Sequence, residues 1–133
     1  MAYEIVWEPR GVVKRFYDHV TGLELLQAGA HTQASIRFDE LRYVVNDFLD
    51  ATGCSVTPDD IDEIAAIDQA ASATNPHIRI IVIATHSYIL AMAHHYASSP
   101  LNVYPTRVFA TRAAGRAWLD VSPAQCPSSL AFK

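Results

Sequence analysis

Two short groups of polar residues have the types and spacing that could do chemistry. Asn46, Asp47 and Asp50 lie near the end of one apolar segment, and Thr85 and His86 follow another. If both segments are neighbouring parallel strands, their carboxyl ends meet at one edge of the sheet, where open α/β folds hold ligands. A carboxylate beside an imidazole could also act as an acid–base pair. These five residues are therefore candidate ligand-binding residues; the alternatives are a small enzyme that uses Asp47, Asp50 and His86, or a purely structural role in the loops.

The common catalytic and metal-binding motifs are absent from the sequence. Ser87 has no Gly-x-Ser-x-Gly surroundings, and there is no glycine-rich phosphate loop. His94 and His95 are adjacent, so on a helix they point about 100° apart and do not share a face. We therefore expect a protein that is not an enzyme, with no catalytic residues, no metal site and no cofactor.

Composition narrows the class of protein and of partner. A chain of 133 residues, half of them hydrophobic, fits one domain with one core. The net charge of −4 argues against nucleic-acid binding and against electrostatic docking on an anionic membrane. The most apolar segment, 78–84, is too short for stable insertion into a bilayer.

The start of the chain and the cysteines predict the compartment. Met1-Ala2-Tyr3-Glu4 lacks the basic and apolar regions of a signal peptide, so we expect a cytoplasmic protein. In that compartment the two cysteines, Cys54 and Cys126, are expected to be free thiols.

The local patterns alternate between strands and helices. β-forming residues separated by a Pro-Arg-Gly turn predict a hairpin, and three later apolar runs predict further strands. The expected strands are 3–7, 12–17, 43–49, 78–84 and 107–109.

Four helices are expected between or after these strands. The first opens at Thr21-Gly22 and gives way to an irregular link over 30–37. After a loop over 50–56, Thr57 caps the second helix, with Pro58 in its first turn and a cluster of acids behind it. The third follows 85–87, and the fourth is capped by Thr111.

This order of elements predicts an α/β fold. Strands that alternate with helices favour a mostly parallel sheet, here a mixed five-stranded sheet with an N-terminal antiparallel hairpin and about four helices. Residues 1–120 form the single domain, and 121–133, which lack periodicity, are expected to be a flexible tail.

The pattern resembles the SpoIIAA-like branch of the STAS domains (sulfate transporter and anti-sigma-factor antagonist). The resemblance rests on the opening hairpin, the strand Tyr43–Phe48, the strand Ile78–Ala84, and Arg107–Phe109 followed by Ala117-Trp118-Leu119. It implies a mixed sheet with helices mainly on one face. It also implies a non-enzymatic regulatory module that binds a protein partner or a small or lipidic ligand.

Antagonists of this family carry a phosphorylatable hydroxyl after the strand that ends in Asp. The resemblance makes Ser55 and Thr57 the phosphorylation candidates, and a phospho-switched regulator is a further alternative. The family's short Asp-Ser-Ser-Gly-like pattern is absent and the loop is longer, which counts against this alternative. The sequence leaves a homodimer open.

Overall fold

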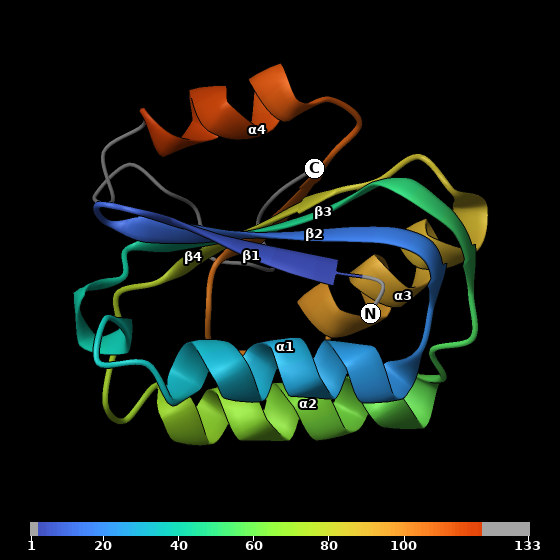
Figure 1. Ribbon diagram of the computed structural model, residues 1–133. Coiled ribbons are helices and arrows are strands. Elements are labelled where there is room, and N and C mark those ends of the chain that lie inside the picture. The colour runs from blue at the N-terminus through green and yellow to red at the C-terminus, as the bar shows by residue number, and fades with distance from the viewer. Residues whose placement is uncertain (1–2, 121–133) are drawn as a thin grey trace.

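Five strands form one sheet that is covered by helices on both faces (Figure 1). The structure is a computed structural model that describes residues 3–120 of the chain, so the expected flexible tail, 121–133, lies outside the described residues. The strands are β1 (Tyr3–Glu8), β2 (Gly11–Val20), β3 (Tyr43–Cys54), β4 (Arg79–Ile83) and β5 (Thr106–Phe109). The helices are α1 (Gly22–Gln33), α2 (Pro58–Ala71), α3 (Ser87–Ala97) and α4 (Arg112–Leu119), with a short 3-10 helix at Phe38–Glu40.

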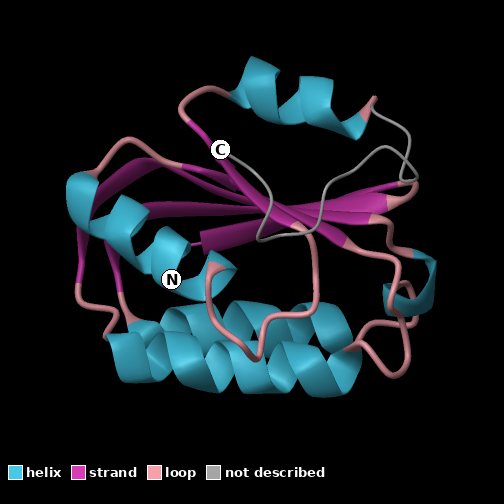
Figure 2. Ribbon diagram, turned by 180° about the vertical axis from the view of Figure 1, so that it is seen from behind, coloured by secondary structure: helices cyan, strands magenta, loops and turns pink. Residues whose placement is uncertain are grey.

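The sheet topology confirms the predicted fold class. The strands lie in the order β1-β2-β3-β4-β5. β1 and β2 form the antiparallel hairpin, and every later pair is parallel. The crossover helices α2 and α3 pack on one face together with α1, whereas α4 lies on the opposite face (Figures 1 and 2).

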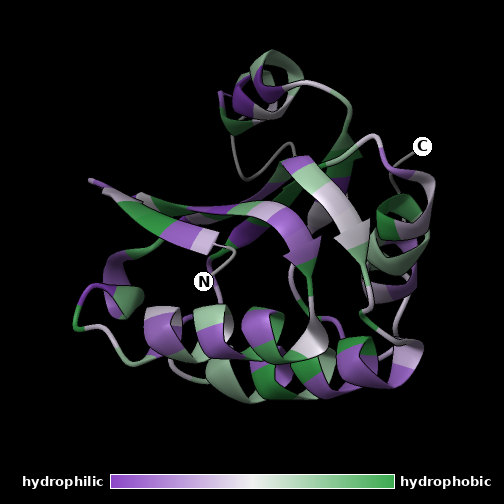
Figure 3. Ribbon diagram, turned by 45° about the vertical axis from the view of Figure 1, so that its right-hand side comes forward, coloured by the Kyte–Doolittle hydropathy of each residue, from purple (hydrophilic) through white to green (hydrophobic). Residues whose placement is uncertain are grey.

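Each face of the sheet has its own hydrophobic core. The larger core lies between the sheet and α1–α3, and Val12, Phe16, Ile80 and Val82 belong to it. The smaller core lies under α4, where Trp118 packs among strand residues that include Ile81. β4 is buried on both faces, as its apolar run predicted, and its arginine stands at the strand's first position. Figure 3 shows that α1 and α2 carry both hydrophobic and hydrophilic bands, as helices between a core and solvent do.

The helices begin where hydrogen-bonding caps stand in the sequence. The Thr57 side chain accepts from the backbone N–H of Asp60, and the Asp60 carboxylate accepts from the N–H of Thr57, so the predicted cap of α2 is confirmed. Thr21 and Glu24 form the same reciprocal pair at α1, and Thr111 caps α4 as predicted. Between residues 3 and 120 no helix is long and apolar enough to cross a membrane.

Two predicted boundaries are wrong. Residues 50–54, expected in a loop, continue β3, because β2 extends to Val20 and pairs with them across two register shifts. These shifts add unpaired residues to β3, which bends a strand and hides its regular alternation. Helix α1 also continues to Gln33 instead of giving way to an irregular link after Ala30.

Candidate functional site

The predicted cluster near the end of β3 is divided between the two faces of the sheet. Asn46 and Asp47 are consecutive residues of a strand, so their side chains point to opposite sides. Asn46 faces the α1–α3 side, where it lines a cavity. Asp47 faces the α4 side and pairs with Arg112.

Asp47 is a buried carboxylate that Arg112 neutralises. Its side chain is only 4% exposed, and the Nε of Arg112 donates to its Oδ2 over 2.5 Å. Its Oδ1 accepts from the backbone N–H of Leu49 over 3.0 Å. The same guanidinium lies 3.4 Å from the Oδ2 of Asp50, which is exposed. The hydrogen bond to Asp47 raises the pKa of Arg112, because the guanidinium lies against a carboxylate.

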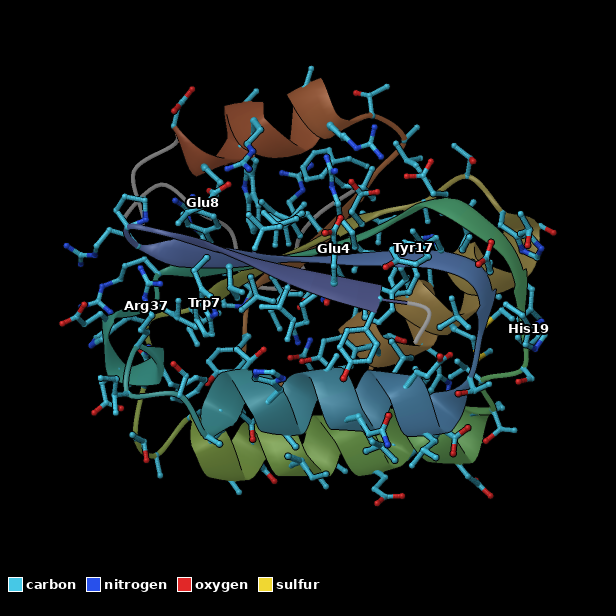
Figure 4. All side chains as sticks on the ribbon, in the orientation of Figure 1. Glu4, Trp7, Glu8, Tyr17, His19 and Arg37 are labelled. Carbon is cyan, nitrogen blue, oxygen red and sulfur yellow. The ribbon has the colours of Figure 1, made fainter. Side chains whose placement is uncertain are left out.

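A second ion pair holds α4 one turn further along. Arg116 donates to both carboxylate oxygens of Glu8, over 2.7 Å and 2.6 Å, and this contact lowers the pKa of Glu8. Figure 4 shows Glu8 on the α4 side of the sheet, while its neighbour Trp7 lies on the other side near Arg37. Because Arg112 and Arg116 are four residues apart, they share a helix face. These polar groups therefore fasten α4 to the sheet.

Thr85 and His86 serve the start of α3. The Nδ1 of His86 accepts from the backbone N–H of Tyr88 over 3.2 Å, which makes His86 the N-cap of that helix. Thr85 is exposed. Within residues 3–120, no hydrogen bond or ion pair joins His86 to Asp47. The structure thus does not form an acid–base pair from these two residues.

Ser55 and Thr57 lie in the connection between β3 and α2. Both residues are exposed, and Thr57 caps α2. Asp59 and Asp60 stand in the first turn of that helix, directly beside them. A phosphate group added here would meet two opposing electrostatic effects. The N-terminus of the helix would attract it, and the two carboxylates would repel it.

A cavity of about 120 Å³ lies between the sheet and helices α1–α3 and is partly open. Its walls are mainly apolar, with Phe16 and Phe48 from the sheet stacked 4.7 Å apart between ring centroids. Ile61 of α2 and Ile89 of α3 contribute further apolar wall. An apolar space with a few polar groups is the usual form of a small-molecule site.

The polar groups of the cavity include a carboxylate that is satisfied by hydrogen bonds. The hydroxyl of Tyr96 donates to Asp68 over 2.6 Å, and the side-chain amide of Gln33 donates to it over 3.0 Å. Burial raises the pKa of Asp68, although both hydrogen bonds act in the opposite direction. Burial also raises the pKa of Tyr96 well above its ordinary value.

Lys14 of β2 is the cation of the cavity. Burial lowers its pKa, and the charge of Asp68 raises it by a smaller amount. Its side chain keeps some accessible area even though it is surrounded by protein, as expected for a group that borders an internal space. Among the described residues, none forms a hydrogen bond with the Lys14 ammonium or an ion pair within 4 Å of it. A buried amine without a partner is costly, because its charged form loses its hydration.

Three residues of these interactions were not predicted from the sequence, namely Lys14, Asp68 and Arg112. The signal for Lys14 was its place between Val12 and Phe16, because alternate residues of a strand share a face and both neighbours are buried. Asp68 stood on the apolar face of α2, at helical spacing from Ile61, Ile64 and Ala65. Arg112 gave no local signal, because its partner Asp47 lies 65 positions earlier in the chain.

No cluster of three or more His, Cys, Asp or Glu side chains that could hold a metal ion occurs in the described range 3–120. Cys54 lines the cavity as a free thiol, and burial raises its pKa. Cys126 lies outside the described residues.

Comparison with known proteins supports the fold. No protein-family model matches the sequence, and no curated protein matches it significantly. The chain is similar to the solved structure of the anti-sigma factor antagonist SpoIIAA in its unphosphorylated form, at 12% sequence identity and a TM-score of 0.59. The match covers 89% of this chain and 97% of that one. With the antiparallel hairpin, the parallel strands and the three-plus-one arrangement of helices, the likeness shows that this chain has the SpoIIAA-like fold of STAS domains.

Proposed function

We propose that this domain is a non-enzymatic, STAS-like binding module that takes a small, mainly apolar ligand into the cavity between its sheet and helices α1–α3. The observation that carries the proposal is the cavity itself, with its apolar walls and its few polar groups, Lys14, Asp68 and Tyr96. Cores of this size are normally packed without such a space.

The volume of the cavity limits the ligand. An engineered apolar cavity of about 150 Å³ holds one benzene molecule, so 120 Å³ suits a compound of about six heavy atoms. A long-chain lipid does not fit in this volume. About four water molecules at ~30 Å³ each would fill the same space, and they are the competing occupants.

Binding is favoured over catalysis because the polar residues of the sheet edge have structural partners. Asp47 is paired with Arg112, and His86 caps α3. A general base needs to reach the proton that it removes. Asp47 and His86 each interact with a different structural partner and not with each other, which supports the non-enzymatic proposal.

The fold supports a regulatory role for the domain when its cavity holds a ligand. SpoIIAA, which shares this fold, is an anti-sigma factor antagonist. By analogy, this domain would bind a protein partner, and the ligand would alter that interaction by ordering the helices that line the cavity.

The binding proposal is tested with 1-pentanol, a neutral amphiphile of about the right size. We expect saturable binding, seen as NMR shifts of cavity residues and as a higher Tm. Gly29 lines the cavity, and a Cβ at this position meets no atom within 4 Å. Gly29→Leu should fill the space and abolish binding, whereas Ala30→Leu, on the exposed part of α1, should leave binding intact. Absence of binding to the wild-type protein would overturn the proposal.

A second candidate function is a switch controlled by phosphorylation of Ser55 or Thr57. It is favoured by the exposure of both hydroxyls at the start of α2 and by the likeness to a protein that has an unphosphorylated form. Phosphopeptide mass spectrometry of the protein isolated from its natural host tests this candidate. Phosphate at either residue would support it, and complete coverage of unmodified peptides under all growth conditions would contradict it.

A further inference from the structure

Lys14 places a primary amine inside an apolar cavity. The side chain comes from the central part of β2, with Val12 and Phe16 buried on the same face. It lines the cavity together with Asp68 and Asn46. None of the described residues satisfies its ammonium. A structural lysine in such a place would normally be replaced by an apolar side chain or be paired, because the lone charge destabilises the fold.

We propose that Lys14 binds a small apolar aldehyde as a reversible imine. The proposal rests on the ligand-binding function argued above and names the class of ligand. The cavity supplies the two structural requirements, an amine that faces the space and apolar walls that hold the rest of the molecule.

The environment keeps the amine reactive. Only the uncharged amine is a nucleophile, and burial of Lys14 shifts its equilibrium towards that form. Asp68 faces the same cavity and is a carboxyl group whose pKa is raised by burial, so it can carry a proton. The described titratable groups around this space also include Tyr96 and Tyr104, and burial raises the pKa of both.

The chemical step balances without an oxidant or reductant. The nitrogen lone pair of Lys14 forms a bond to the carbonyl carbon, and one of the two nitrogen protons moves to the carbonyl oxygen to give a carbinolamine. Asp68 then protonates the hydroxyl, which leaves as water, and the resulting iminium nitrogen returns its remaining proton to the Asp68 carboxylate. One aldehyde and one amine give one imine and one water, and addition of water reverses the reaction.

Charge favours an aldehyde over a carboxylic acid as the ligand. The cavity already holds the Asp68 carboxylate, which has its own two hydrogen-bond donors. A ligand carboxylate would add a second negative charge to an apolar space. An aldehyde is neutral, so neither it nor its neutral imine adds a charge to the cavity.

The sequence gives this proposal an internal control. The chain has only two lysines, Lys14 and Lys133. The full-length protein is incubated at pH 7 with pentanal and sodium cyanoborohydride, which reduces imines to stable secondary amines, and peptide mapping measures alkylation at each lysine. We expect Lys14 to be alkylated faster than Lys133, because burial lowers the pKa of Lys14 and the cavity holds the aldehyde beside its amine.

Two variants and a competitor connect this labelling to the cavity. Gly29→Leu and an excess of 1-pentanol should both suppress alkylation of Lys14 and leave Lys133 unchanged. Lys14→Met should retain binding of 1-pentanol, which needs no amine. If 1-pentanol binds but Lys14 is alkylated no faster than Lys133, the imine is wrong and the binding function stands. If neither compound binds, both proposals are overturned.

Discussion

The buried carboxylate of Asp47 in β3 is held by the guanidinium of Arg112, which lies 65 positions later at the start of α4. The contact joins the centre of the sheet to a helix whose own hydrophobic contacts come from few residues, Trp118 and Leu119 among them. It also explains how a cation is tolerated in the first turn of a helix, where the helix dipole disfavours it.

Removal of Arg112 should therefore destabilise the domain. Arg112→Met leaves Asp47 buried with one remaining donor, and we expect a loss of about 2 kcal/mol in the free energy of unfolding, measured by urea denaturation. The matched control is Arg116→Met, which frees the more accessible Glu8 and should cost about 1 kcal/mol or less. Equal losses in the two variants would show that the burial of Asp47 is not what matters.

The cap of α2 can be tested at Thr57. Thr57→Ala removes the side-chain acceptor of the Asp60 N–H and should lower the free energy of unfolding by about 1 kcal/mol. Thr57→Asp keeps an acceptor and should be close to neutral. If the alanine variant unfolds at the same urea concentration as the wild-type protein, the cap does not contribute to stability.

Replacement of Lys14 by an apolar residue should increase the free energy of unfolding. Lys14→Met replaces the buried amine by an apolar side chain of similar length, and we expect a gain of about 1 kcal/mol at pH 7. Arg15→Met, at the exposed neighbouring position, should change stability by less than ~0.5 kcal/mol. A clear loss of stability in Lys14→Met would mean that the amine has a stabilising structural role.

Asp68 should make stability depend on pH in a direction opposite to that of most carboxylates. Its pKa is raised in the folded state above the ordinary value of 3.8, so the folded protein holds the proton more tightly than the unfolded chain. The contribution of this proton to the free energy of unfolding is complete below pH 3.8, the ordinary pKa of the carboxyl group. It is lost as the pH rises through the pKa that Asp68 has in the folded state.

Asp68→Asn cannot titrate, so the free energy of unfolding of this variant should rise relative to the wild-type protein as pH increases from 4 towards 7. Urea denaturation across this range measures the difference. Lys14 faces Asp68 from β2 and lowers its pKa, so the same comparison in a Lys14→Met background should give a larger pH effect. A constant difference across the range would contradict the raised pKa.

The fold was predictable from local patterns to a much greater extent than the site. The hairpin turn, the apolar run of β4 and the Thr57-Pro58 cap are signals carried by neighbouring residues, and each marks an element that the structure confirms. The end of β3 was not predictable in this way, because its last residues are held by pairing with β2 across two irregularities.

The candidate site depended on side-chain directions that a list of polar residues does not contain. Asn46 and Asp47 seemed to belong to one cluster because they are adjacent, yet the pleat of the strand separates them by the thickness of the sheet. Lys14 could have been found by applying the same alternation to β2. That the Lys14 ammonium lacks a partner could not have been predicted in this way, because it depends on how three helices pack over this face of the sheet.

The strands lie across the sheet in the order in which the ribosome makes them. Each new strand therefore meets a partner that has already emerged, and β1, β2 and β3 can align once residue 54 has left the exit tunnel. Until β4 follows, β3 is an open, apolar edge that can pair with another nascent chain. The interval between residues 54 and 79 is thus one stage of synthesis at which the nascent chain can aggregate. β4 then covers the edge of β3, and β5 later covers the edge of β4.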